Sequence, residues 1–91
     1  MIEAPLTLPC GQVLPNRLAK AAMTEGLADP AGRPTAELEQ LYRVWGAGGC
    51  GVLLSGNVHI DADHLERPGN VIIDRPADAA MLEALRRWTA A

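Results

Sequence analysis

A cluster of four glycines at positions 46, 48, 49 and 51 separates the clearest helical pattern of the chain from its most apolar short run. Before the cluster, apolar side chains recur at the spacing of one helix face, and they are Leu38, Leu41, Tyr42 and Trp45. After it, residues 52–54 form the continuous apolar run typical of a strand buried on both faces of a parallel sheet. This order of helix, glycine turn and strand predicts an α/β fold.

The residues upstream of the helix supply its partner strand. Residues 17–23 are a run of small and apolar side chains that we assign to a strand, and residues 25–34 form a loop rich in glycine and proline. Thr35 is a favourable N-cap for the helix that follows this loop. Further upstream, residues 6–8 and 12–14 flank a turn containing Gly11, which predicts a short β-hairpin.

The residues downstream of the second strand alternate in the same way. Residues 55–77 are polar and irregular, with one brief extended piece at residues 71–73. Asp78 can cap a closing helix, in which Glu83 and Arg87 are spaced for an ion pair. The apolar stripe of that helix consists of Met81, Leu82, Leu85 and Trp88. The chain therefore reads as two β/α units behind a hairpin.

Length and composition limit the function classes that remain. We treat residues 1–91 as a single partial domain, because a closed barrel needs roughly 250 residues. The net charge is −3 and the basic residues are scattered, which argues against nucleic-acid binding. No apolar run is long enough to span a membrane, so we expect a cytoplasmic protein. We expect the two cysteines, Cys10 and Cys50, to be buried thiols in a reducing compartment.

Two patterns resemble a nucleotide-binding motif and a metal site, and each has a simpler structural explanation. Residues 46–51 match the letters of the GxGxxG dinucleotide fingerprint, but that motif needs a strand before it and a helix after it, and here the order is reversed. His59 and His64 share a polar loop with several carboxylates at a spacing that fits no standard zinc or calcium site. We therefore predict a helix-to-strand turn and a solvated loop, with no metal ligands.

Residues 14–25, Leu-Pro-Asn-Arg-Leu-Ala-Lys-Ala-Ala-Met-Thr-Glu, resemble the N-terminal flavin-site motif of the old yellow enzyme and NADH:flavin oxidoreductase family. Residues 51–58, Gly-Val-Leu-Leu-Ser-Gly-Asn-Val, are similar to the second barrel strand of that family. Residues 66–70 and the closing Leu-Arg-Arg-Trp helix also fit, so the resemblance covers nearly the whole chain in order. It implies the first two β/α units of a (β/α)8 TIM barrel, an incomplete barrel preceded by a short N-terminal β-hairpin.

The resemblance also implies a cofactor and its contacts. In the family, the end of the first strand packs along the isoalloxazine of FMN, so the cofactor-binding residues here would be Ala21, Ala22, Met23 and Thr24. Thr24 would lie near the redox-active edge of the ring. Many family members have proline where Ala22 stands. Either Gly56 or Asn57, at the end of the second strand, would add a further contact.

The implied function is that of a flavin oxidoreductase that passes a hydride from NAD(P)H through FMN to an activated alkene or similar small-molecule substrate. The family's later glutamine, histidine and tyrosine residues have no counterparts here, so we expect this chain to carry no catalytic residue and to be inactive alone. The alternative is a non-catalytic β/α structural or interaction module. Its unpaired strand edges would dock on another chain or on a second copy of itself.

Overall fold

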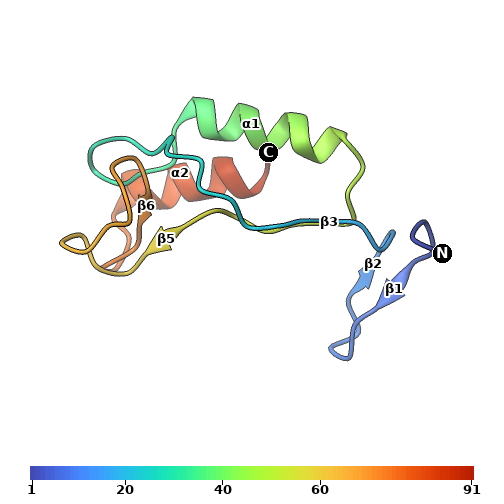
Figure 1. Ribbon diagram of the computed structural model, residues 1–91. Coiled ribbons are helices and arrows are strands. Elements are labelled where there is room, and N and C mark those ends of the chain that lie inside the picture. The colour runs from blue at the N-terminus through green and yellow to red at the C-terminus, as the bar shows by residue number, and fades with distance from the viewer.

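A computed structural model describes residues 1–91, and its first feature is a small hairpin that stands apart from the rest of the molecule (Figure 1). Strands β1 (Leu6–Thr7) and β2 (Val13–Leu14) pair antiparallel, with Leu6 opposite Leu14. The turn uses Gly11 at a φ of 92°, which confirms the predicted hairpin. The radius of gyration is 14.6 Å, above the roughly 12 Å of a compact chain of this length, because the hairpin projects outward.

Strand β3 (Ala19–Lys20) lies beside β4 (Val52–Leu53) in parallel, and helix α1 (Ala36–Ala47) forms the connection between them. This confirms the predicted β-α-β unit. The strand predicted at residues 17–23 is shorter in the structure, because only Ala19 and Lys20 pair with β4. Asn16 closes one end of the ladder: its side-chain amide donates to the Gly49 carbonyl at 2.8 Å and its Oδ1 accepts from the Leu18 amide at 3.0 Å.

Helix α1 begins and ends where the sequence predicts. The Thr35 side chain accepts from the Leu38 amide, and Glu37 and Glu39 lie in the first turn, where they favour the positive end of the helix dipole. The chain leaves the helix through Gly48 and through Gly49, which has a φ of 90°. The glycine cluster is thus a helix-to-strand turn, as predicted.

The second half of the chain holds a strand pair of which the sequence predicts only one member, the extended piece at residues 71–73. Strands β5 (Val58–His59) and β6 (Val71–Ile72) pair in parallel inside the region predicted to be irregular, and helix α2 (Ala79–Thr89) follows them. Strand β6 confirms the predicted extended piece, whereas β5 lies in residues predicted to be irregular, and there the prediction is wrong. These strands form because backbone groups distant in the chain meet: the Ile72 amide donates to the Gly32 carbonyl at 2.9 Å, and the Ala28 amide donates to Gly69 at 2.8 Å.

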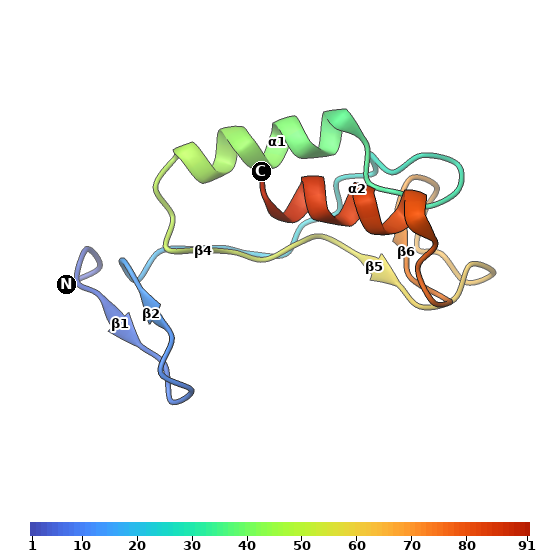
Figure 2. The same cartoon turned by 180° about the vertical axis from the view of Figure 1, so that it is seen from behind.

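The two helices lie on the same side of the β3–β4 ribbon, and the core forms between them (Figure 2). Leu38, Tyr42, Val71 and Trp88 are its buried apolar side chains. Tyr42 meets Trp88 edge to face, with ring centroids 5.4 Å apart. Only 9 of the 91 residues are buried, so each core contact carries a large share of the stability.

Two side-chain predictions are wrong. Arg87 does not pair with Glu83; its Nε lies 2.9 Å from a carboxylate oxygen of Glu39, so the ion pair links α2 to α1. The exposed position of Arg87 allows either partner, and the packing of the helices selects Glu39. The cysteines are not both buried, since Cys10 is exposed in the hairpin turn and Cys50 is half-buried.

The strands form three separate two-stranded sheets, so the chain is a mixed α/β structure and does not close into a barrel. The expected order of a strand, a helix and a parallel strand is present. No helix of the chain combines the length and the apolar character needed to cross a bilayer.

Leu38 is the most deeply buried side chain, at 1% exposure, and we predict that Leu38→Ala lowers the free energy of unfolding by about 2 to 5 kcal/mol. The lost contacts and the cavity both oppose folding. Urea unfolding followed by tryptophan fluorescence measures the change. Leu82→Ala is the matched control, because Leu82 is 43% exposed on α2 and its truncation should have much less effect. Equal effects of the two substitutions would contradict this account of the core.

Candidate functional site

The predicted site residues lie at one edge of the parallel ribbon. Ala21, Ala22, Met23 and Thr24 directly follow β3, and Gly56 and Asn57 follow β4. Because β3 and β4 run in parallel and pair in register, their carboxyl ends face the same way. The structure therefore brings the two predicted segments together. In parallel α/β folds this is the edge at which ligands bind.

Gly56 is buried where the two segments approach most closely. A Cβ atom at this position would overlap the carbonyl oxygen of Met23 and the carboxylate of Glu25. Only glycine allows the backbone after β4 to pass this close to the backbone after β3. Asn57, the next residue, is exposed and its side chain reaches Thr24.

Glu25 joins three elements at this edge. Its Oε2 accepts a hydrogen bond from the Tyr42 hydroxyl on α1 and one from the Gly56 amide, the latter at 3.0 Å. Sequence reasoning placed Glu25 in a loop and missed this role. The available signal was Tyr42, because a tyrosine on the core-facing stripe of a helix needs an acceptor for its hydroxyl.

The environment of Tyr42 keeps its hydroxyl protonated. Burial is the largest cause, and the hydrogen bond to Glu25 and the negative charge of that carboxylate add to it; together they raise the pKa of Tyr42 well above its ordinary value. The phenol is thus a permanent donor to Glu25 at neutral pH, and the carboxylate stays available to the Gly56 amide.

Lys20 on β3 turns toward α1. Its ammonium lies 4.6 Å from the centroid of the Trp45 ring and 5.6 Å from that of Tyr42, and it donates to the Ala21 carbonyl at 2.6 Å. This cation thereby anchors the first residue of the predicted flavin segment to the helix, in contacts of a kind that contribute about 0.5 to 1 kcal/mol each at exposed sites.

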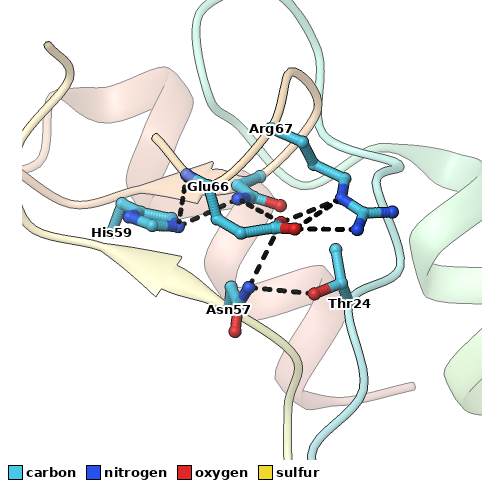
Figure 3. Close-up of polar contacts among 6 residues, drawn as sticks. Thr24, Asn57, His59, Glu66 and Arg67 are labelled. Atoms are coloured by element: carbon cyan, nitrogen blue, oxygen red, sulfur yellow. Dashed lines mark hydrogen bonds and ion pairs between the residues drawn. The ribbon is translucent and has the colours of Figure 1, made fainter. Parts of the chain in front are cut away.

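A second group of polar side chains surrounds Thr24 and Asn57, and we call it the strand-end cluster (Figure 3). Its members are Thr24, Asn57, His59, Glu66, Arg67 and Asn70. The loop from β5 to β6 supplies Glu66 and Arg67, so the loop that looked merely solvated contributes to this edge. Of this set, sequence reasoning assigned only Thr24 and Asn57 to the cofactor site; it placed His59 in a solvated loop and used residues 66–70 only for the family resemblance.

Hydrogen bonds link the members of the cluster. Asn70 is 3% exposed, and its Nδ2 lies 2.9 Å from His59 Nε2, which also accepts from the Glu66 amide at 3.4 Å. Two amide nitrogens, one from Asn70 and one from the Glu66 backbone, therefore face His59 Nε2. Hydrogen bonding from the Arg67 side chain is the main cause that holds the pKa of Glu66 below its usual value, so Glu66 is a carboxylate at neutral pH.

The two histidines do not act together. His59 contacts Asn70, whereas His64 Nδ1 pairs with Asp61 at 2.7 Å on the exposed side of the loop. No group of three or more histidine, cysteine, aspartate or glutamate side chains gathers as a set of metal ligands.

The strand-end edge is an open surface. The two hollows of the molecule lie elsewhere, one of about 410 Å³ beside the start of α2 and one of about 450 Å³ between the carboxyl-terminal ends of α1 and α2. Neither is lined by any residue of segment 21–24 or by Asn57. The flat exposed backbone of Ala21 and Ala22 can be reached by a planar ligand, but this chain does not enclose one.

We predict that Gly56→Ala destabilises the chain by about 1 to 3 kcal/mol, because the added methyl group forces the two strand ends apart. Gly46→Ala is the matched control. Gly46 lies inside α1 with no atom near its Cβ position, and alanine there should stabilise the helix by up to about 1 kcal/mol. Urea denaturation of both variants provides the measurement, and a neutral Gly56→Ala would refute the close approach.

Tyr42 is the only tyrosine, so alkaline titration of phenolate absorbance reports on it alone. We predict ionisation above the ordinary pKa of about 10, and a lower pKa in Glu25→Gln, which removes the carboxylate charge. Because the pKa of Tyr42 is higher in the folded state than in the unfolded state, the protonated hydroxyl contributes its full stabilisation below the unfolded pKa. That contribution is lost as the pH rises through the folded pKa. The exposed Glu37→Gln should leave the titration unchanged; a Tyr42 that titrates normally in the parent chain would contradict the Glu25 contact.

Curated relatives of the chain carry one common name. The chain is 43% identical over 88 residues to the NADH-dependent flavin oxidoreductase iliE of Neonectria sp. (strain DH2), covering 96% of this chain and 12% of the relative. It is 36% identical over 85 residues to the NADH-dependent flavin oxidoreductase iliE of Hypocrea jecorina (strain QM6a), covering 92% of this chain and 21% of the relative.

A third relative, the NADH-dependent flavin oxidoreductase nadA of Aspergillus parasiticus, is 42% identical over 66 residues. The match covers 65% of this chain and 15% of that relative. No protein-family model matches the chain. The chain thus spans about an eighth to a fifth of the length of the first two relatives. The chain matches one part of each relative, and it belongs to the family of NADH-dependent flavin oxidoreductases.

Proposed function

We propose that this chain is the flavin-contacting first part of an NAD(P)H-dependent flavin oxidoreductase of the old yellow enzyme type, with FMN as cofactor and a barrel as the complete fold. The observation that carries the proposal is the meeting of segment 21–24 with residues 56 and 57 at the carboxyl edge of β3 and β4. A cytoplasmic location, a small-molecule substrate and the absence of a nucleic-acid partner belong to the same proposal.

The residues present fit a flat ring at this edge. Ala21, Ala22 and Met23 are exposed, and their small or flexible side chains leave backbone groups within reach of a planar cofactor. Bound FMN would supply a hydride relay from NAD(P)H to an activated alkene or similar acceptor. The role of this chain is to position the ring and to offer it hydrogen-bond donors, while the rest of the enzyme supplies the substrate groups.

The structure favours Asn57 over Gly56 as the second contact. The Gly56 amide already donates to Glu25, and the residue is buried behind Met23. Asn57 is exposed and adjoins Thr24, so its side chain lies on the same surface as the first segment. We assign Gly56 the role of bringing the two strand ends together.

The open surface explains why we expect the isolated chain to bind FMN weakly. A cofactor pocket buries most of its ligand, and two short parallel strands cover at most one side of a ring. The alternative role, a docking module without flavin, would instead show itself as a stable oligomer of the isolated chain in size-exclusion chromatography.

The test is a chimera in which this chain replaces the matched 85 residues of the Hypocrea jecorina relative. We predict one bound FMN per chimera and oxidation of NADH or NADPH. Ala22→Glu should weaken FMN binding at least tenfold, about 1.4 kcal/mol, because it places a charged side chain on the ring face. Ala47→Glu, at an equally exposed alanine in α1, is the matched control and should leave binding unchanged.

Equal FMN affinity in Ala22→Glu and the unaltered chimera would overturn the assignment of segment 21–24. Tight stoichiometric FMN binding with NADPH oxidation by the isolated chain would overturn the view that further barrel elements are required. Both outcomes are read from flavin absorbance and from the loss of NAD(P)H absorbance.

A further inference from the structure

The Thr24 hydroxyl has a hydrogen-bond donor that no group in the chain uses. Asn57 Nδ2 lies 2.9 Å from Thr24 Oγ1 and donates to it (Figure 3). A hydroxyl carries one hydrogen and two acceptor lone pairs. Thr24 accepts from Asn57 and its own O–H donates to no atom of the protein, so that hydrogen is available to an acceptor on a bound ligand.

Glu66 determines which end of the Asn57 amide faces Thr24. The Glu66 carboxylate accepts hydrogen bonds and cannot donate them, and its Oε2 lies 3.4 Å from Asn57 Nδ2. If the amide were reversed, Asn57 Oδ1 would face the carboxylate and the Thr24 hydroxyl would have to donate to Asn57. The carboxylate therefore selects the amide orientation, which in turn leaves the Thr24 hydrogen free.

The carboxylate is itself held in place and ionised. Arg67 contacts both of its oxygens, with Nε at 2.8 and 2.9 Å and the terminal nitrogen at 2.7 Å. The buried Asn70 adds a contact from Nδ2 to Oε2 at 3.5 Å, and the Glu66 backbone amide donates to His59. Every charged or donor group around the carboxylate thus favours the acceptor state on which the orientation of Asn57 depends.

We propose that Asn57 and Glu66 are positioning residues that hold the Thr24 hydroxyl as a hydrogen-bond donor toward an acceptor atom of the flavin. This inference rests on the proposed function and assigns roles within the same site. A donor directed at the ring stabilises the electron-rich reduced flavin more than the oxidised form. The hydrogen-bond chain from Arg67 to Thr24 therefore raises the reduction potential of the cofactor.

The first test is a double-mutant cycle in the chimera with Thr24→Val and Asn57→Asp, read as the reduction potential of bound FMN. An aspartate at 57 can only accept, so the Thr24 hydroxyl turns to donate to it and the flavin loses its donor. We expect Asn57→Asp to lower the affinity for reduced FMN relative to the affinity for oxidised FMN. This loss should be about tenfold larger when Thr24 is present than in the Thr24→Val background. For two electrons this is about 30 mV.

Charge alone gives a different result in that cycle. If the aspartate acts only through its negative charge, Asn57→Asp shifts the potential equally with and without Thr24→Val, and that outcome overturns the positioning role. Gln12→Glu, which adds the same charge to the exposed hairpin turn, is the control for effects at a distance and should not move the potential.

The second test needs no flavin and uses the 91-residue chain. The side-chain amides of its three asparagines, Asn16, Asn57 and Asn70, can be followed by nitrogen-edited NMR. We expect Glu66→Gln to shift the Asn57 and Asn70 resonances and to leave those of Asn16 in place, while the exposed Glu37→Gln shifts none. An unmoved Asn57 amide overturns the hydrogen-bond chain whether or not FMN binds, whereas a chimera without FMN overturns the proposed function.

Discussion

The Glu25 carboxylate is the contact on which the geometry of the strand ends depends. It lies one residue beyond Thr24 and accepts hydrogen bonds from α1 through Tyr42 and from the end of β4 through Gly56. A half-buried carboxylate without these donors would be costly, since an unsatisfied charged group loses its hydration without compensation. With them, it ties the helix to both strands at the edge where the predicted cofactor contacts lie.

This arrangement explains how a chain with so small a core can present an ordered polar edge. The buried apolar set is four side chains that lie between the helices and β6, and of these Tyr42 also contacts the strand ends through Glu25. At the strand ends, order comes from hydrogen bonds between residues distant in the chain, including Asn57 to Thr24 and the Gly56 amide to Glu25. The Glu66 carboxylate adds contacts to Asn57 and Asn70. The same edge is open to solvent, which fits a segment whose relatives are several times longer.

Some elements could be predicted because their signals are local. The helix around Leu38 and Tyr42 is encoded in the spacing of apolar residues and in the Thr35 cap, and the glycine cluster marks its end. The extended piece at β6 could be predicted from its apolar run, whereas β5 could not be found in this way, because it has only two residues and forms by pairing with β6. Only Glu83 lies within reach of Arg87 along the sequence, and the packing of α2 on α1 brings Arg87 to Glu39 instead.

The sequence by itself determined the hairpin, the β3–α1–β4 unit, the closing helix and the family resemblance that the relatives confirm. These features reside in neighbouring residues or in an ordered string of motifs. The tertiary structure alone decided which side chains meet at the strand ends. Glu25 and Gly56 are 31 positions apart, and Glu39 and Arg87 are 48 apart. The free energy of such contacts depends on how the intervening elements pack, and no local pattern encodes that packing.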